Sequence, residues 1–361
     1  MSRPDTTAVG TPRASGTCCR ARLTAPIVLG LLLLIIALMP QPTGAWEWTP
    51  SDEEIMKYRR SWNPLTNGPI LLSGVDIQPK GQFLFQPFVF GQISHQQFGN
   101  QLTTERRDSP THLKAVAPTG IFAYGITDHL ELNLVLSGIW YDATQTSATG
   151  SKSSTNETGM GDTTIYLKYR PIVQDPDSWR PSVTLYNQIA LPSSNWFGTK
   201  GIPGGFSPLG RLPATRFGAL SLTEGVLFRK NLQPFRISGG VFYTYTAPGS
   251  TAGMNTYPGD IVNTRLIIEH ILNDKRGFGY NLELVTLHGL PHRLDGHALN
   301  IDPASFSLFG IQPTLQYKLS ENLVGAAGVL FTVAGQNNVD AIYPNISLYY
   351  YWNNNGKVTM R

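Results

Sequence analysis

Cysteine is almost absent from this chain of 361 residues. Its two cysteines, Cys18 and Cys19, stand together before an apolar run at Ile27–Met39. That run has the length of a signal-peptide hydrophobic region and falls short of the roughly 20 residues of a transmembrane helix. Small residues follow, ending at Ala45. We therefore expect residues 1–45 to be a cleaved secretory signal peptide, whose loss leaves a mature chain without disulfides or thiolate chemistry.

Charge is also scarce. Charged residues make up 14% of the chain, and its net charge is +4. The first 45 residues hold four arginines and one aspartate, or +3, so the mature chain carries only 4 − 3 = +1. The basic character belongs to the leader, which excludes nucleic acid as an expected partner. No glycine-rich phosphate loop leads into a helix, and we expect no cofactor. The mature chain also has no second long apolar run, so we expect no transmembrane helix.

What the chain does contain is alternation. The stretch Leu130–Trp140 places Leu130, Leu132, Leu134 and Leu136 on one face of an extended strand, because successive side chains of a strand point to opposite sides. Polar residues occupy the other face. A helix would scatter these leucines, so a strand with one fully apolar face is predicted.

The same pattern recurs along the chain with turn and loop residues between the repeats. We expect twelve strands of about ten residues, the length of a tilted bilayer crossing. Short turns alternate with long polar loops, except for a shorter last loop at 335–340, and the two ends of the strand region fall on one side. The expected strands are 81–91, 113–124, 130–141, 162–171, 183–191, 217–229, 235–245, 261–272, 278–288, 306–317, 323–334 and 342–352.

This organisation predicts an all-β fold. Residues 81–352 are expected to form a closed antiparallel up-and-down transmembrane β-barrel of about 12 strands in the outer membrane of a Gram-negative bacterium, in contact with its lipids. Closure pairs every backbone N–H and C=O in hydrocarbon. Aromatic residues near strand ends suit the lipid–water boundaries. Residues 353–361 are interpreted as a C-terminal tail.

The segment 46–80 precedes the barrel and is expected to contain a short helix. Ser51 and Glu54 have the spacing of a capping box, and Asn63-Pro64 ends the helical pattern. Two interpretations remain open: a periplasmic segment, or a plug that enters the lumen.

Strand parity identifies the polar residues that face inward. If Leu132 faces lipid, Glu131 lines the lumen, so Leu132→Arg should block insertion whereas Glu131→Arg should alter selectivity alone. The parity of Phe217–Arg229 is ambiguous because Glu224 shares a face with leucines, and a bulge could reset it. The predicted pore-lining residues are Glu131, Asn133, Lys168, Arg265, Glu269 and Glu283, joined by Asn263 and Asn281. Arg265, Glu269 and Glu283 could form a ladder of charges that sets the ion preference of the pore. Alternatively, they could simply line a hydrated lumen wall, or form salt bridges that fill it.

Enzymatic and metal chemistry have weaker support. Ser94 and His95 are adjacent, so a strand points them apart and they make a poor nucleophile–base pair. His288, His292 and His297 lie in or beside one loop, and their spacing favours solvated histidines over a metal site. We predict neither catalytic nor metal-binding residues.

Three short motifs resemble a known family. Gly161-Asp-Thr-Thr-Ile-Tyr-Leu-Lys-Tyr-Arg170 resembles the strand motif GDxxxxxKYR of the outer-membrane proteins of the meta-pathway of phenol degradation family. Gly125–Leu132 and Leu315–Leu323 resemble two hairpins of that family. The resemblance covers about 81–352. It implies an outer-membrane channel for small aromatic or hydrophobic compounds.

The function expected from the sequence is therefore passive passage of a small molecule through the barrel. Twelve strands give a barrel between those filled by side chains and the wide porins, so a narrow or gated pore is expected. Two alternatives remain: a barrel enzyme that acts on lipid at the outer face, and a structural barrel that does not conduct. The sequence leaves the oligomeric state and the solute open.

Overall fold

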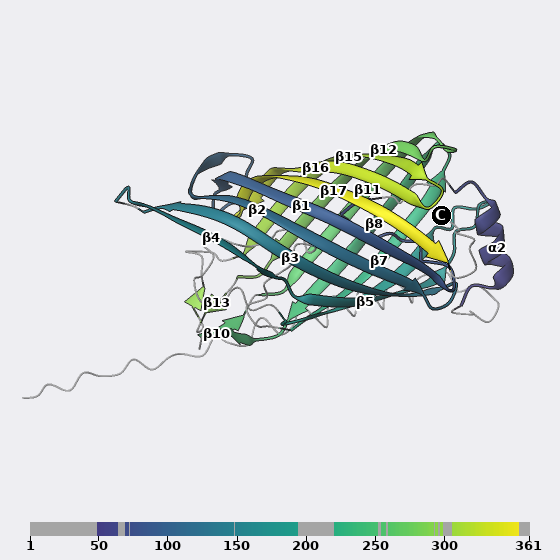
Figure 1. Ribbon diagram of the computed structural model, residues 1–361, viewed down its shortest axis with the longest axis horizontal. Helices are drawn as coiled ribbons and strands as arrows, with labels where there is room; N and C mark the ends of the chain where they lie inside the picture. Colours follow the sequence, from purple (N-terminus) through teal and green to yellow (C-terminus); the bar gives the residue numbers. More distant parts are fainter. Residues whose placement is uncertain are drawn as a thin grey trace, which may run out of the picture. The chain divides into compact units, whose positions relative to one another are not determined.

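The computed structural model describes residues 49–63, 69–71, 73–147, 149–193, 220–251, 254–257, 259–291, 293–294, 297–298 and 305–353. Twelve antiparallel strands close into a barrel, since the run of hydrogen-bonded neighbours that starts at β2 returns to β2 through β3 (Figure 1). The predicted barrel of about twelve strands is confirmed. These strands are β1 (Gln82–Phe98), β2 (Arg106–Gly125), β3 (Leu130–Thr146), β5 (Thr163–Ile172), β6 (Ser182–Leu191), β7 (Ser221–Leu232), β8 (Phe235–Thr246), β11 (Ile261–Asn273), β12 (Phe278–Gly289), β15 (Phe306–Ser320), β16 (Leu323–Gln336) and β17 (Val339–Asn353).

Closure brings the first and last strands together. β1 pairs with β17 from Gln82, opposite Asn353, to Gln97, opposite Val339. Each of the other neighbouring pairs also runs antiparallel. The wall therefore satisfies its own backbone hydrogen bonds around the ring, as a barrel in hydrocarbon must.

Alternation sorts the side chains between the two surfaces of the wall. On β3, Leu132 and Leu136 are 39% and 40% exposed on the exterior, whereas Glu131 and Asn133 are 1% and 2% exposed in the interior. The exterior carries many exposed large apolar side chains on the other strands as well. An apolar exterior around an interior that also buries charged and amide side chains differs from the arrangement of a water-soluble sandwich and suits a barrel in lipid.

An aromatic girdle surrounds the exterior at the end where the β-strand region begins and ends. The ring of Phe83 lies 4.5 Å from that of Tyr124 and 5.2 Å from that of Trp352, measured between ring centroids. Phe278 and Tyr317 make a further pair at 6.2 Å. Aromatic rings favour the interface between lipid and water, so this girdle marks one boundary of the apolar band.

β7 differs from the expectation of a bulge. It pairs with β6 and β8 without a register shift, so its parity is continuous. Glu224 therefore shares the exterior with Leu222, and Arg229 faces the interior. Asn187 lies directly across from Glu224 on β6, also on the exterior. The irregular pattern in the sequence reflects one polar pair on the outer surface and no change of facing.

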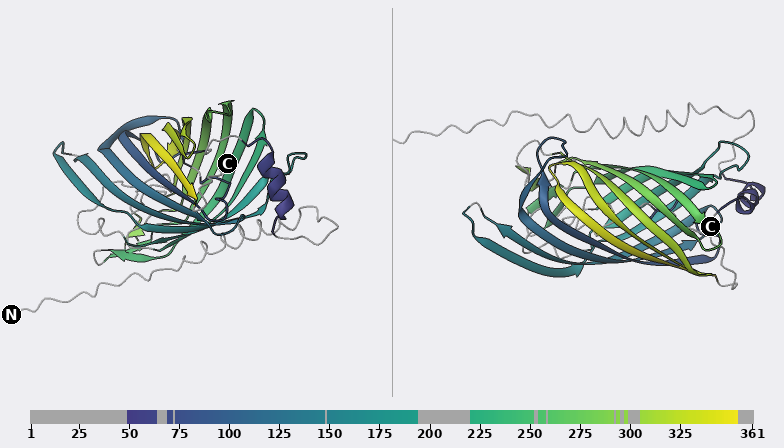
Figure 2. Two further views of the ribbon diagram at one scale, coloured as in Figure 1. Left: turned by 45° about the vertical axis from the view of Figure 1, so that its right-hand side comes forward. Right: turned by 90° about the horizontal axis from the view of Figure 1, so that it is seen from above.

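Several predicted loops contain strands. β1 and β2 extend through most of 93–111. β4 (Lys152–Met160) pairs with Gly138–Thr146 of β3 and projects beyond the barrel at the end opposite the aromatic girdle (Figures 1 and 2). A small second sheet holds β9 (Gly249–Thr251), β10 (Met254–Tyr257), β13 (Arg293–Leu294) and β14 (His297–Ala298). β4 and the extensions of β1 and β2 are rich in polar residues, so they lack the row of apolar residues that reveals strands in the wall. The short last loop is a tight turn in which Asn337 has a positive φ of 48°.

The helix α2 (Asp52–Arg60) begins with the predicted capping box. The backbone N–H of Glu54 donates to the Ser51 hydroxyl at 3.2 Å, and the N–H of Ser51 donates to the Glu54 carboxylate at 3.1 Å. α2 lies at the girdle end of the barrel (Figures 1 and 2). Of the helices within the described residues, none has the length and apolarity needed to cross a membrane.

Candidate functional site in the barrel lumen

Part of the chain before β1 lies inside the barrel. We call residues 69–71 and 73–79 the lumen segment. Its backbone is held by side chains from several strands: the N–H of Ile70 donates to Glu283 Oε1 at 2.8 Å, the N–H of Gln78 donates to Glu131 Oε2 at 2.6 Å, and the hydroxyl of Thr184 donates to the carbonyl of Val75 at 2.6 Å. An irregular chain can be buried only where its backbone groups find partners. The polar interior of the wall supplies them.

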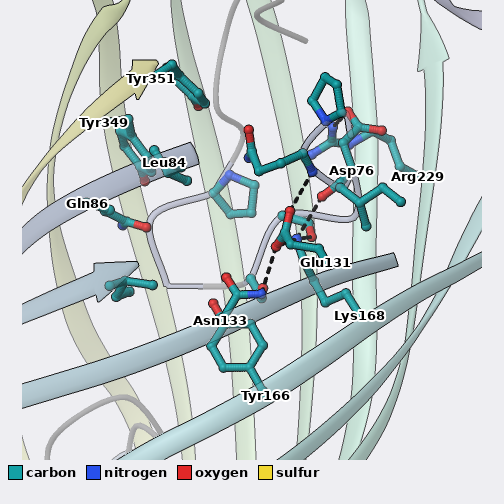
Figure 3. Close-up of a pocket in the computed structure, with 17 residues that line it drawn as sticks. Asp76, Leu84, Gln86, Glu131, Asn133, Tyr166, Lys168, Arg229, Tyr349 and Tyr351 are labelled. Atoms are coloured by element: carbon teal, nitrogen blue, oxygen red, sulfur yellow. Dashed lines mark hydrogen bonds and ion pairs between the residues drawn. The ribbon is translucent and has the colours of Figure 1, made fainter. Parts of the chain in front are cut away.

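Lys168 and Glu131 anchor the middle of this segment. They form an ion pair at 2.8 Å, with side chains only 5% and 2% exposed. The Lys168 ammonium also donates to the carbonyls of Gly74 and Asp76, at 3.0 and 2.7 Å. The Asn133 amide donates at 2.9 Å to Glu131 Oε1, the same oxygen that pairs with Lys168. Figure 3 shows these side chains converging on the segment from β3 and β5.

The remaining predicted residues lie on β11 and β12, and all are buried on the inner face. Arg265 donates to the carbonyl of Leu71 and, at 3.1 Å, to Asn263. Glu283 accepts from Ile70 and Leu71. Glu269 forms its ion pair with Arg236 of β8, at 3.2 Å.

These contacts change what Glu131→Arg should do. The sequence predicts normal insertion and altered selectivity alone. In the structure, an arginine at 131 would face Lys168 and would remove the acceptor of the Gln78 N–H. Like charges at this separation repel, and a buried unpaired cation is costly. We therefore expect Glu131→Arg to disturb the lumen segment as well.

A second cluster centres on Asp76. Its Oδ1 accepts from Arg170 Nη1 at 3.1 Å and from the Tyr58 hydroxyl at 2.9 Å, and its Oδ2 accepts from Arg229. The side chains of Arg170 and Arg229 are 0% and 2% exposed, and that of Asp76 is 12% exposed. Burial, reinforced by the Asp76 carboxylate, raises the pKa of Tyr58, so its hydroxyl remains a donor. Removing one partner of such a buried cluster is far more costly than removing an exposed ion pair.

The sequence did not predict Asp76, Arg170, Arg229 and Arg236, which form the ion pairs of the Asp76 cluster and of Glu269. Arg170 could have been found, since it lies two residues after Lys168 on the same strand and shares its facing. Arg229 was obscured by the uncertain parity of its strand. Asp76 lies in an irregular segment, where no periodicity reports facing.

α2 attaches to the short turns at the girdle end. Lys57 contacts Asp175 at 2.8 Å and Asp177 at 2.9 Å, and Arg59 pairs with Asp128. Hydrogen bonding to Asp175 raises the pKa of Lys57, and the same contact lowers the pKa of Asp175 to about 2. These pairs are partly exposed, so each stabilises the attachment weakly and is screened by salt.

An apolar contact supports the same attachment. Ile55 and Tyr58 of α2 pack with Val173, which follows β5. Arg170 lies 5.6 Å from the centre of the Tyr58 ring, within the range of a cation–π contact. Tyr58 therefore links helix α2 to the Asp76 cluster.

The space left beside the lumen segment is small. A cavity of about 70 Å³ lies between the segment and the wall, lined by Glu131, Asn133, Tyr166 and Lys168 among others (Figure 3). A cavity that binds benzene measures about 150 Å³, whereas a water needs about 10–15 Å³. The cavity accommodates waters, and an aromatic solute would need the segment to move.

The three histidines of the predicted loop, His288, His292 and His297, lie only partly within the described residues. His288 lies on the exterior of β12, where its Nδ1 is 2.8 Å from the Ser307 hydroxyl. His292 and the side chain of His297 are not among the described parts. Within the described residues, no group of three His, Cys, Asp or Glu side chains could hold a metal. Ser94 faces inward and His95 outward, as their adjacency predicts.

Comparison with known proteins supports the fold. No protein-family model matches the chain, and no curated protein matches it. Among solved structures, an outer membrane channel from Pseudomonas putida F1 is 12% identical, with a TM-score of 0.59 over 81% of this chain and 100% of that chain.

Two more distant barrels are also similar in outline. The transport unit of the autotransporter AIDA-I from Escherichia coli is 12% identical, with a TM-score of 0.46 over 83% of this chain and 99% of that chain. The CymD monoaromatic hydrocarbon channel is 10% identical, with a TM-score of 0.39 over 81% and 99%. Neither likeness is close enough to indicate function. The closed twelve-strand wall and the likeness to the Pseudomonas putida F1 channel show that the chain has the fold of an outer-membrane β-barrel.

Proposed function

We propose that this protein is a passive channel of the Gram-negative outer membrane, for small and largely apolar molecules, and that the lumen segment is its gate. The proposal extends to membership of the meta-pathway of phenol degradation family, on the sequence motifs described above. The twelve-strand fold and its likeness to the Pseudomonas putida F1 channel are consistent with it.

One observation carries the proposal: the segment inside the barrel packs Ile70, Leu71 and Val75 against apolar wall residues, but its backbone is held by polar contacts from wall side chains. Glu283, Glu131, Thr184 and Lys168 make contacts of this kind. Water can replace these polar partners when the segment leaves. Undocking also exposes the apolar side chains of the segment that pack against the wall, and this cost favours the docked state in the absence of solute.

The gate can be tested by weakening one anchor. Glu283 accepts two backbone N–H groups of the segment, and hydrogen bonds to a charged group contribute about 1.5–3 kcal/mol each. Glu283→Gln keeps the shape and removes the charge. If about 2 kcal/mol is lost, the undocked population rises roughly thirtyfold. Planar-bilayer conductance and swelling of liposomes in a small neutral aromatic solute should both increase.

Leu282→Val is the matched control, because Leu282 is the adjacent residue of β12 and faces the exterior. It should leave conductance unchanged. If wild type and Glu283→Gln are both folded yet neither conducts nor swells, the protein is a structural barrel. Release of fatty acids from the liposomes would favour the lipid enzyme instead.

A further inference from the structure

We propose that Val75 and Asp76 occupy a binding site for a small monocarboxylate with an apolar body, for example an aromatic carboxylate such as benzoate. The proposal rests on the channel function above and names its substrate class. In this view the lumen segment closes the channel by placing its own carboxylate where that of the solute would bind.

The polar half of the site is the pair Arg170 and Arg229. The two arginines hold opposite oxygens of the Asp76 carboxylate, one donor to each. Both are almost fully buried in the barrel interior. Arg170 Nε and Arg229 Nη2 are buried without a hydrogen-bond partner, so the pair has donors left over. Guanidinium groups recognise carboxylates through such multiple donors.

The apolar half lies beside this pair. Val75 is fully buried against Tyr166, Tyr186, Leu227 and, at the edge, Phe242. The rings of Tyr166 and Tyr186 are 4.9 Å apart between centroids, and those of Tyr186 and Phe242 are 5.3 Å apart at a right angle.

The two halves belong to the same strands. Leu227 lies two residues before Arg229 on β7, which is about 7 Å along a strand. Tyr166 lies four residues before Arg170 on β5, on the same inner face. A recess of aromatic rings next to a guanidinium pair matches a molecule with a ring at one end and a carboxylate at the other.

The charge of the interior argues for a monoanion. Among the buried charged side chains of the described barrel strands and turns, five are cations and four are carboxylates; the cations are Lys168, Arg170, Arg229, Arg236 and Arg265, and the carboxylates are Glu131, Asp162, Glu269 and Glu283. Without Asp76 the balance is 5 − 4 = +1. Asp76 restores neutrality, and a solute with one negative charge would do the same. A neutral or cationic solute would leave the two arginines uncompensated.

Competition between solute and segment gives the test. Ser73 is only partly buried and lies within the lumen segment. Ser73→Cys, in a chain whose Cys18 and Cys19 are serine, carries one thiol whose labelling rate reports undocking. Benzoate should increase this rate in a saturable manner, whereas benzyl alcohol and benzylammonium should not. Asp76→Asn should raise the rate without benzoate by about thirtyfold or more, as expected for one partner of a buried charge pair.

Selectivity provides the second measurement. Asp76→Asn should shift the reversal potential of the channel toward anions and increase benzoate flux relative to benzyl alcohol. Glu105→Gln removes an exposed carboxylate from the loop between β1 and β2 and should leave selectivity unchanged. Replacing both Arg170 and Arg229 with lysine retains the charge and loses the paired donors, so it should abolish the preference for benzoate. Heat-modifiable gel mobility verifies that each variant is folded.

The outcomes separate the two proposals. If neither current nor flux of any solute is found, the channel function fails. If the channel conducts, but benzoate neither competes with the segment nor passes better than benzyl alcohol in Asp76→Asn, the carboxylate site is refuted and the channel stands.

Discussion

The depth of an arginine on the exterior of β3 should decide how much it destabilises the barrel. Leu132 lies opposite Tyr124, at the level of the aromatic girdle, and Trp140 lies eight residues further along β3. Eight residues of a strand tilted by about 40° rise roughly 20 Å, close to the height of the apolar band of such barrels. Leu136 is midway, so the bilayer centre falls there and not at Leu132.

The magnitude follows from this placement. Leu132 and Leu136 are almost equally exposed, at 39% and 40%, so each substitution loses a similar apolar contact with lipid. An arginine costs about 2–4 kcal/mol at the bilayer midplane and about 0–1 kcal/mol near the interface. Leu136→Arg should therefore be less stable than Leu132→Arg by about 2 kcal/mol, or roughly thirtyfold in the unfolding equilibrium. The expectation that Leu132→Arg blocks insertion is replaced by a mild effect.

Urea unfolding of protein refolded into lipid vesicles measures this difference, followed by tryptophan fluorescence and by heat-modifiable gel mobility. Equal destabilisation by the two variants would refute the assignment of depth. No destabilisation by either would refute the assignment of the leucine face to lipid, because an arginine in water costs nothing comparable.

Three other substitutions or titrations test separate features. Glu224→Leu removes a carboxylate from the exterior and should raise stability toward urea by about 1 kcal/mol, whereas lower stability would show that this carboxylate has a structural role. The contact of Lys57 with Asp175 should persist from neutral pH to about pH 4 and be lost as the pH falls toward 2, because the pKa of Asp175 is lowered to about 2. Hydrogen exchange of the α2 amides should become faster over this pH range, and Lys57→Met should abolish that change. Gly125→Ala would place a Cβ in steric overlap with the carbonyl oxygen of Pro79, so it should displace the end of the lumen segment and increase conductance; unchanged conductance would mean that Pro79 can yield without undocking.

Most of the barrel wall could be predicted because its physical requirement is local. A strand between lipid and lumen must alternate, and the alternation from Leu130 to Trp140 is visible in the sequence alone. The failures are also explained by this rule. β4 and the extensions of β1 and β2 carry mostly polar residues, so they lack the apolar row that marks a strand of the wall, and Glu224 breaks the pattern without breaking the strand.

The sequence by itself determined which side faces lipid in each strand whose apolar residues alternate without a break, since hydrocarbon disfavours charge at such positions independently. It also determined that residues such as Glu131 and Lys168 face inward. Only the tertiary structure decided their partners, because closure brings together strands distant in the chain and the lumen segment crosses between them. Asp76 meets Arg170 and Arg229 across 94 and 153 residues, and no periodicity encodes a contact whose geometry is set by the diameter of the closed ring.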